Sequence, residues 1–267
     1  MSADDRQQRG SGLPVPPARP WDAPRAPEPA VRPAQQPQPA PRHRRHLMSV
    51  AIFLLLVSGV LIQAYRELSA PGAWDYWNDR YFSPSMTSSV ADNVDLGGRR
   101  LQALVLRGKI GAASASWFRE RLDEAKLRAG DAVVISSLGG DVGQSLIMGE
   151  VIRTRGLVTA VGTVDTSGRV GPASCASACV FVFAGGKTRF GVEGSRLGVH
   201  RFTTKPATAD PVADAQRVTG TMLSYLTKMG ISASVFVEAM SRTGDIRWLN
   251  MQEAVSMNLI TDPLRKP

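Results

Sequence analysis

The stretch Ser174–Gly186, SCASACVFVFAGG, has the composition of a small-residue loop that runs directly into a buried helix. The apolar run ends in two glycines, which are typical of a helix terminus. Ser177 lies at the turn where the helix begins. Its hydroxyl can cap that helix, or it can act as a nucleophile beside backbone N–H groups that suit a developing oxyanion. The local sequence leaves both interpretations open.

Apolar strands alternate with helices on both sides of this stretch. We predict strands at 101–108, 132–140, 157–163 and 196–202, and helices at 114–130, 142–154, from about 177, from 211 behind Asp210, from 233 behind Ser232, and from the capping box at 250–253. Near-continuous apolar strands in alternation with helices are typical of a mostly parallel sheet covered by helices. The predicted fold class is therefore α/β.

The N-terminal part has a different composition. Residues 1–41 contain eleven of the eighteen prolines and few large apolar residues, so we predict that 1–46 is a disordered Pro/Arg-rich tail. Residues 47–65 are uncharged and long enough to cross a bilayer as one transmembrane helix. A cleaved signal peptide is the alternative, but its n-region would be unusually long. We expect a connector at 66–98 and the folded domain at 99–267.

Charge around the apolar segment predicts its orientation. Arg42, Arg44 and Arg45 precede the segment, whereas Arg66 and Glu67 cancel each other after it. The positive-inside rule then places the tail in the cytoplasm. We expect a single-pass protein of the inner (cytoplasmic) membrane, with its C-terminal domain periplasmic or otherwise extracytoplasmic.

The formal net charge of +9 does not indicate nucleic-acid binding. The tail through His46 carries eight Arg and four acidic residues, and the remaining excess is spread along the chain. No block of basic residues interleaved with aromatic residues occurs in the domain, so we expect no nucleic-acid partner.

His200 is the only histidine after the tail, and it falls at the end of a predicted strand. A zinc site needs three or four converging ligands, so we expect no metal, and no other cofactor is indicated. A lone histidine is more often structural than catalytic. Gly139 and Gly140 end another strand, where a residue without Cβ lets the backbone approach a substrate carbonyl.

Three motifs between Arg100 and Phe202 resemble the proteolytic subunit of the Clp protease, within the wider Clp/crotonase superfamily. VVISSLGGDV is similar to the family's strand ending in Ser-Pro-Gly-Gly, CASACVFVFAGGKTRF to its nucleophile helix, and GSRLGVHRF to its strand ending in histidine. They occur in the family's order, and WLNMQEAVSMNLITD is a weaker match to its closing segment. The resemblance implies the Clp/crotonase-like ββα-repeat (spiral) fold.

The resemblance also implies roles for individual residues. Ser177 would be the nucleophile, His200 the general base, and the N–H groups of Gly139 and Ala178 the oxyanion hole. The ungapped position of the third triad member is Arg242, so the nearest carboxylate, Asp245, is our candidate.

Several features depart from the family pattern. Leu138 replaces its proline, the loop before the nucleophile is longer, and segment 201–230 is too short for the handle that builds the Clp double ring. Membrane-bound relatives use a serine and lysine pair, for which Lys187 and Lys205 are the nearest candidates, although His200 fits its motif better.

Cys175 and Cys179 flank the serine. A disulfide is chemically allowed in an oxidising compartment, and its geometry is feasible if Cys175 still lies in the loop. Two buried thiols that act as small hydrophobes are the alternative.

Three functions follow from these observations. The first is a membrane-anchored serine hydrolase, a peptidase that acts on peptide or protein substrates. The second is a catalytically inactive Clp-like module that binds peptides or proteins, and the third is a crotonase-type acyl-CoA enzyme. A homo-oligomer is possible, but we expect Met222, Leu226 and Met229 to form core rather than a subunit contact.

Overall fold

The computed structural model describes residues 42–201, 210–241 and 245–264. Of the predicted disordered tail, residues 1–46, the first 41 fall outside the described residues, whereas residues 42–46 belong to a helix that begins at Arg42. The chain divides into two compact units, Met1–Ser58 and Gly59–Pro267.

The predicted apolar helix is present as α1 (Arg42–Leu68). Its portion His46–Leu68 has a mean hydropathy of 2.4 over its most apolar window and is long enough to cross a membrane. Most of the large apolar side chains of this portion are exposed; Leu55, for example, is 72% exposed. Length, composition and exposure all fit a single membrane span.

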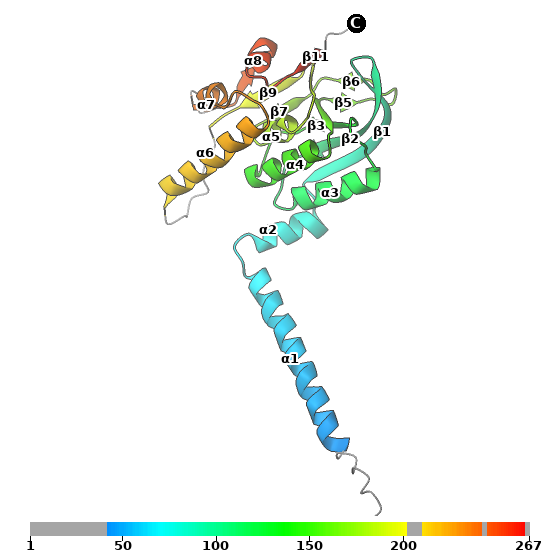
Figure 1. Ribbon diagram of the computed structural model, residues 1–267, viewed down its shortest axis with the longest axis vertical. Helices are drawn as coiled ribbons and strands as arrows, with labels where there is room; N and C mark the ends of the chain where they lie inside the picture. The colour runs from blue at the N-terminus through cyan, green and yellow to red at the C-terminus, as the bar shows by residue number, and fades with distance from the viewer. Residues whose placement is uncertain (1–41, 202–209, 242–244, 265–267) are drawn as a thin grey trace, which may run out of the picture. The chain divides into compact units, whose positions relative to one another are not determined.

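The main sheet has six strands in the order β1-β2-β3-β4-β8-β11. Only the β1–β2 pair is antiparallel, and the other four pairs are parallel (Figure 1). The α/β fold with a mostly parallel sheet is therefore confirmed. The strands are β1 (Met86–Leu96), β2 (Arg99–Gly108), β3 (Ala132–Ser136), β4 (Val158–Val161), β8 (Arg189–Val192) and β11 (Asp262–Leu264).

A smaller sheet lies next to the end of β3 and has the order β10-β9-β7. Its strands are β7 (Ser174–Ala176), β9 (Arg196–Val199) and β10 (Arg247–Leu249), with β7 and β9 parallel. A bridge between Ser137 and Cys175 joins this sheet to the chain that leaves β3. The long loop before the serine contains a two-stranded hairpin, β5 (Thr163–Val164) and β6 (Val170–Gly171).

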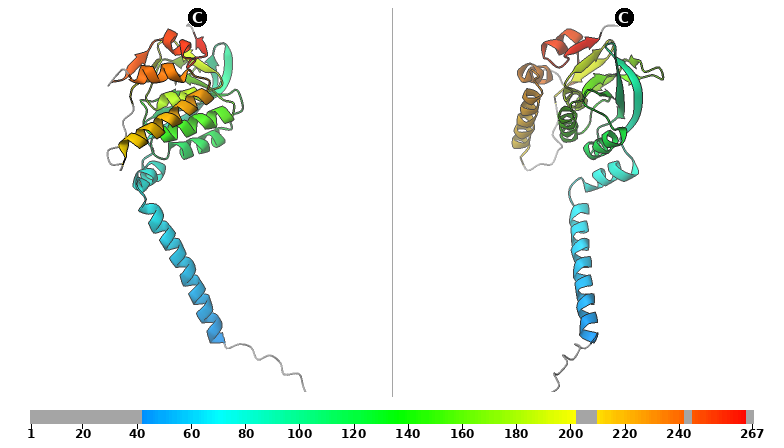
Figure 2. Two further views of the ribbon diagram at one scale, coloured as in Figure 1. Left: turned by 60° about the vertical axis from the view of Figure 1, so that its left-hand side comes forward. Right: turned by 45° about the vertical axis from the view of Figure 1, so that its right-hand side comes forward.

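Helices cover one face of the main sheet, and two further views show them gathered on that side (Figure 2). Two of them start at the predicted caps: Asp210 accepts from Ala213 N at 3.0 Å, and Asn250 and Glu253 form the capping box. The helix after Ser177 has Ala178 as its N-cap and no side-chain cap, so Ser177 does not cap it. The first of the covering helices ends earlier than predicted, because Lys126 already adopts the left-handed conformation that closes it. The helices are α3 (Ser114–Ala125), α4 (Val142–Thr154), α5 (Cys179–Ala184), α6 (Pro211–Lys228), α7 (Ala233–Ser241) and α8 (Met251–Ser256).

The central strands have two apolar faces, which explains their continuous apolar sequence. Leu104 and Ile135 belong to the large core under the helices, whereas Val105 and Val134 belong to a smaller core on the other face. Met222, Leu226 and Met229 are all buried in the large core. The expectation that these three side chains form core is confirmed.

Residues 66–98 contain more regular structure than the expected connector. They form α2 (Ala73–Trp77), a short π-helix η1 (Asn78–Phe82) and the eleven-residue strand β1. The sequence of β1 is polar because it is an edge strand that is only partly covered, and a register shift between Ala91 and Val94 interrupts its alternation. A partly solvated, bulged strand lacks the apolar signal on which strand prediction depends.

Candidate active site

Ser177 lies in the turn between β7 and α5. Its φ is +56°, in the left-handed region that non-glycine residues rarely adopt. Two backbone bonds hold the turn: Ser177 N–H donates to the Gly198 carbonyl at 2.9 Å, and Val180 N–H donates to the Ser177 carbonyl at 3.1 Å. A left-handed conformation costs about 1 kcal/mol or more for such a residue, and outliers of this kind gather at functional sites.

The parallel pairing of β7 with β9 brings His200 to the same edge as Ser177. The last paired residues are Ala176 and Gly198, so both chains leave the small sheet side by side. Ser177 and His200 line one small cavity, together with apolar side chains from α4, α5, α6 and α7. No hydrogen bond joins the two side chains within the described part of the chain, and such bonds are often long before substrate binds.

The ring of His200 is oriented by the backbone. Nδ1 lies 2.5 Å from the carbonyl oxygen of Arg201, which can only accept a hydrogen bond. Nδ1 is then the donor, and Nε2 carries a lone pair that can accept a proton. From the sequence we expected a carboxylate, Asp245, to orient the imidazole of His200. The role of the Arg201 carbonyl was not predicted.

Asp245 is exposed and lies two residues before β10. The antiparallel pairing of β10 with β9 ends at Arg247 and Val199, so Asp245 lies at the same end of the small sheet as His200. In the described ranges no hydrogen bond connects these two side chains. The structure thus brings the candidate acid to the right edge without joining it to the imidazole. Arg242, the ungapped position of the third triad member, and Lys205, a candidate base in place of His200, lie outside the described residues.

Gly139 and Ala178 meet beside Ser177. A Cβ placed on Gly139 would lie 2.7 Å from Ser177 Cβ and 3.0 Å from Ala178 N. Gly139 also has a φ of +100°, so it lacks both the space and the backbone conformation for another residue. The two candidate oxyanion donors therefore flank the candidate nucleophile.

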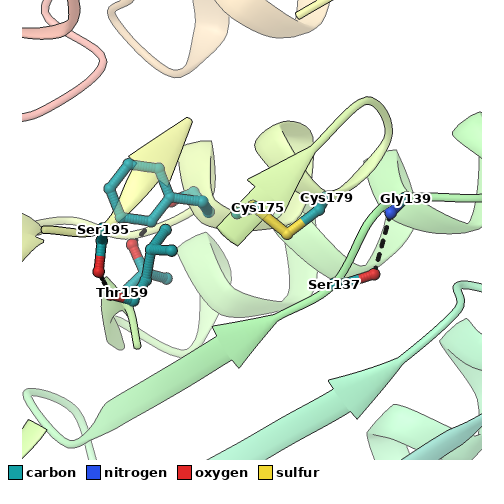
Figure 3. The surroundings of a disulfide bond; sticks show 8 residues. Ser137, Gly139, Thr159, Cys175, Cys179 and Ser195 are labelled. Carbon is teal, nitrogen blue, oxygen red and sulfur yellow. Dashed lines mark hydrogen bonds between the residues drawn. A yellow bond between two sulfur atoms is a disulfide. The ribbon is translucent and has the colours of Figure 1, made fainter. Parts of the chain in front are cut away.

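These two donors differ in their partners. Gly139 N–H donates to the Ser137 hydroxyl at 3.1 Å (Figure 3), whereas Ala178 N–H has no partner among the residues that the structure describes. An oxyanion would have to displace the Ser137 hydroxyl to use the Gly139 donor. Sequence reasoning missed Ser137, although its place two residues before the glycine pair was a usable signal.

Gly140 fixes the position of this glycine loop. A Cβ on Gly140 would lie 2.0 Å from the Ile110 carbonyl oxygen. Ile110 N–H donates to the Gly139 carbonyl at 2.9 Å, and Asp141 N–H donates to the Ile110 carbonyl at 2.8 Å. The loop is thereby pinned to the segment that follows β2.

The sulfur atoms of Cys175 and Cys179 are bonded to each other, with the two Cα atoms 5.3 Å apart (Figure 3). Cys175 is the middle residue of β7 and Cys179 is the first residue of α5, so the bridge encloses the Ser177 turn. Both residues are fully buried. The left-handed turn brings the strand and the helix close enough for this bridge, which a continuous helix would not allow.

A groove with a volume of about 640 Å³ runs beside the glycine loop, and most of its exposed lining is apolar. Gly139 belongs both to this groove and to the contact with Ser177. The groove has the size that drug-sized or peptide ligands occupy in proteins. Its other lining residues are Gly108, Lys109, Ser136, Ser137, Leu138, Gly140 and Ser174.

Lys187 lies just before β8, at the amino ends of the parallel strands. Its Nζ is near Gly156, immediately before β4, and its N–H donates to the Leu157 carbonyl at 3.0 Å. In a parallel sheet the amino ends of the strands lie on one side and the carboxyl ends on the other. Ser177 lies at the carboxyl end of β3, where Ser137 pairs with Cys175. Lys187 is therefore not placed to serve as a base for Ser177.

A buried tyrosine supports the wall of the cavity. The Tyr225 hydroxyl donates to the Phe181 carbonyl at 2.6 Å, and burial raises the pKa of Tyr225 above its ordinary range. Phe181 lines the cavity that contains Ser177 and His200. Tyr225 therefore stays protonated and acts as a hydrogen-bond donor to α5 rather than as an acid or a base.

No protein-family model and no curated protein matches the chain. Among solved structures, ClpP1 from Listeria monocytogenes is similar at 16% identity, covering 62% of this chain and 92% of ClpP1, with a TM-score of 0.49. A mutant of the 1510-N membrane-bound stomatin-specific protease is similar at 15% identity, covering 61% of this chain and 78% of that protease, with a TM-score of 0.46. A second mutant of this protease, in complex with a substrate peptide, is similar at 17% identity, with a TM-score of 0.46.

Proposed function

We propose that the chain is a serine hydrolase that cleaves peptide bonds. In its catalytic triad Ser177 is the nucleophile, His200 the general base and Asp245 the acid. The single observation that carries the proposal is the convergence of Ser177 and His200 on one cavity. No group of three or more possible metal ligands occurs within the described residues.

The proposed reaction begins when Ser177 Oγ attacks the substrate carbonyl carbon and Nε2 of His200 takes the hydroxyl proton. The oxyanion is stabilised by Ala178 N–H, and by Gly139 N–H once the Ser137 hydroxyl has turned away. Collapse of the intermediate releases the amine, which takes the proton from His200. Water then hydrolyses the acyl-enzyme by the same steps.

Peptide substrates are supported by the groove beside Gly139, whose size and mainly apolar lining suit the side chains of an extended peptide. The sequence resemblance supports the same substrate class.

The experiment is labelling of the purified full-length chain with a fluorophosphonate probe. Ser177→Ala and His200→Ala are expected to abolish labelling, and Asp245→Asn to slow it. Ser89→Ala, at an exposed position on the edge strand β1, is the matched control and should label at the rate of the unmodified protein.

A second candidate is a peptide- or protein-binding module without turnover. It is favoured by two specific observations: Asp245 is not bonded to His200, and Gly139 N–H is occupied by Ser137. A folded protein that binds peptides but never reacts with the probe would establish this candidate instead.

The proposed location is the inner membrane, with α1 as a single span and the α/β unit outside the cytoplasm. Proteinase added to intact spheroplasts should digest the C-terminal unit and leave a short membrane-protected fragment. Digestion only after the membrane is permeabilised would reverse the orientation.

A further inference from the structure

Large aromatic side chains are exposed together on α2 and η1. Trp74 is 69% exposed, Tyr81 61% and Phe82 73%. Trp74 stacks on Phe82 with ring centroids 6.3 Å apart, and Trp77 stacks on Tyr81 at 5.2 Å. We call these four residues the aromatic face. A contiguous apolar patch of this kind marks an interaction surface.

The same segment is fastened to the α/β domain. The buried carboxylate of Asp79 accepts hydrogen bonds from Ser85 N–H at 2.9 Å and Ala113 N–H at 2.8 Å. A Cβ on Gly111 would lie 2.4 Å from Asp79 Oδ2, so the carboxylate is closely enclosed. The aromatic face therefore cannot turn inward without breaking the two hydrogen bonds of the buried Asp79 carboxylate.

Two further contacts attach η1 and α2 to α3, which lies next to them (Figure 1). Arg80 forms an ion pair with Glu120, and this carboxylate raises the pKa of Arg80 above its ordinary range. Tyr76 Oη is 3.5 Å from Ser116 Oγ. These contacts attach the segment to the domain, while Trp74, Tyr81 and Phe82 remain exposed.

The chain sequence limits how far this face can lie from the apolar helix. α1 ends at Leu68 and α2 begins at Ala73. Five residue steps span at most about 18 Å, and the polar interface on each side of a bilayer is about 5–8 Å thick. If α1 spans a membrane, as the proposed function holds, the aromatic face starts no more than about 18 Å from the end of α1, within reach of the interface in which Trp and Tyr are enriched.

We propose that the aromatic face, Trp74, Trp77, Tyr81 and Phe82, lies in the lipid headgroup region of the membrane that α1 crosses. The partner is the lipid surface itself. Because Asp79 and Arg80 attach the same segment to the α/β domain, this contact holds the domain at a fixed height above the bilayer. The proposed active site would then cleave polypeptide chains that pass close to the membrane surface.

The test uses the full-length chain in phosphatidylcholine vesicles that contain lipids brominated in the upper part of the acyl chain. Bromine quenches tryptophan fluorescence only at close range, and α1 contains no tryptophan. We expect brominated vesicles to quench the unmodified protein. Trp74→Phe together with Trp77→Phe should remove more than half of that quenching, whereas Trp248→Phe, on β10 in the small sheet, should leave it unchanged.

The proposal is overturned if the Trp74→Phe, Trp77→Phe protein is quenched as strongly as the Trp248→Phe control. That result is expected if a second copy or another protein covers the aromatic face. Far-ultraviolet circular dichroism and a thermal melt verify that each variant is folded. Ser177→Ala protein should be quenched like the unmodified chain, so this test can fail or succeed independently of hydrolysis.

Discussion

A Cβ on Gly139 would lie 2.7 Å from the Cβ of Ser177, so the glycine loop after β3 and the serine turn before α5 are in direct backbone contact. Two segments almost forty residues apart in sequence thus meet at the candidate site. The contact requires glycine, both for space and because of its φ of +100°.

Gly139→Ala is therefore expected to displace the loop from the serine turn and to remove one oxyanion donor. The loss of one such donor lowers the rate by about 100-fold or more. The rate constant for fluorophosphonate labelling measures this effect. Gly220→Ala is the matched control, because nothing lies within 4 Å of a Cβ at that position of α6. Equal labelling of both variants would contradict the role of the glycine loop.

Replacement of both cysteines, Cys175→Ala with Cys179→Ala, tests the bridge around Ser177. A bridge that closes so short a loop contributes about 2 kcal/mol to the free energy of unfolding. Without it the left-handed turn at Ser177 is less well held, so we also expect slower labelling. Chemical denaturation and the labelling rate measure the two effects. A double variant with unchanged stability and unchanged labelling would show that the bridge supports neither.

Arg189 is a buried cation whose hydrogen bonds end on backbone carbonyls. Its guanidinium donates to the carbonyls of Leu259 at 2.9 Å, Gly186 at 3.0 Å and Asn258 at 2.6 Å. Burial lowers the pKa of Arg189 to about 10, so the group remains charged at neutral pH. It ties the end of α5 to the segment that follows α8.

Arg189→Met should leave these carbonyls without partners and lower the free energy of unfolding by about 3–5 kcal/mol. Arg217→Met removes an exposed ion pair with Asp214 and should cost about 1 kcal/mol or less. Urea unfolding of both variants measures the difference. Similar losses in the two variants would show that the buried guanidinium has no special role.

Asp165 organises the hairpin loop before the serine. The Ser167 hydroxyl and the backbone N–H of Arg169 donate to its carboxylate, and these bonds lower the pKa of Asp165 to about 2. A lowered folded-state pKa stabilises the fold above the ordinary pKa and loses this effect as the pH falls through the folded-state value. The contribution should therefore be present at neutral pH and disappear toward about pH 2.

We expect Asp165→Asn to melt at a lower temperature than the unmodified protein at about pH 6, with the difference closing as the pH approaches about 2. Ser167→Ala, which removes the first of the donors, should reproduce part of the difference. Thermal melts across this pH range measure both variants. A difference that is independent of pH would exclude the charge of Asp165 as its cause.

Local signals explain which elements could be predicted from the sequence. The start of α6 behind Asp210 and the capping box of Asn250 with Glu253 depend on neighbouring residues, and both are present. The parallel strands are apolar on both faces, which the sequence displays directly. These predictions succeeded because each residue's role is fixed within one turn or one strand. The short strand β8 is also buried, but its four residues were not predicted as a strand.

The features that were not predicted depend on how the folded chain places its backbone, which residue type alone does not show. β1 is polar because it is an edge strand. The carboxylate of Asp79 is buried because it accepts hydrogen bonds from the backbone N–H groups of Ser85 and Ala113. The orientation of His200 by the Arg201 carbonyl depends on a backbone conformation that no motif encodes. For Asp79 and His200 the partner of the side chain is a backbone group, and the position of that group depends on the fold.

The proposed function depends most on Ser177 as the reactive group next to His200. The most direct measurement is peptide mapping, by mass spectrometry, of the full-length chain after reaction with a fluorophosphonate. The account predicts a single adduct on Ser177, which is absent from His200→Ala protein that is otherwise folded. An adduct on a different serine, or no adduct on folded protein, would contradict it.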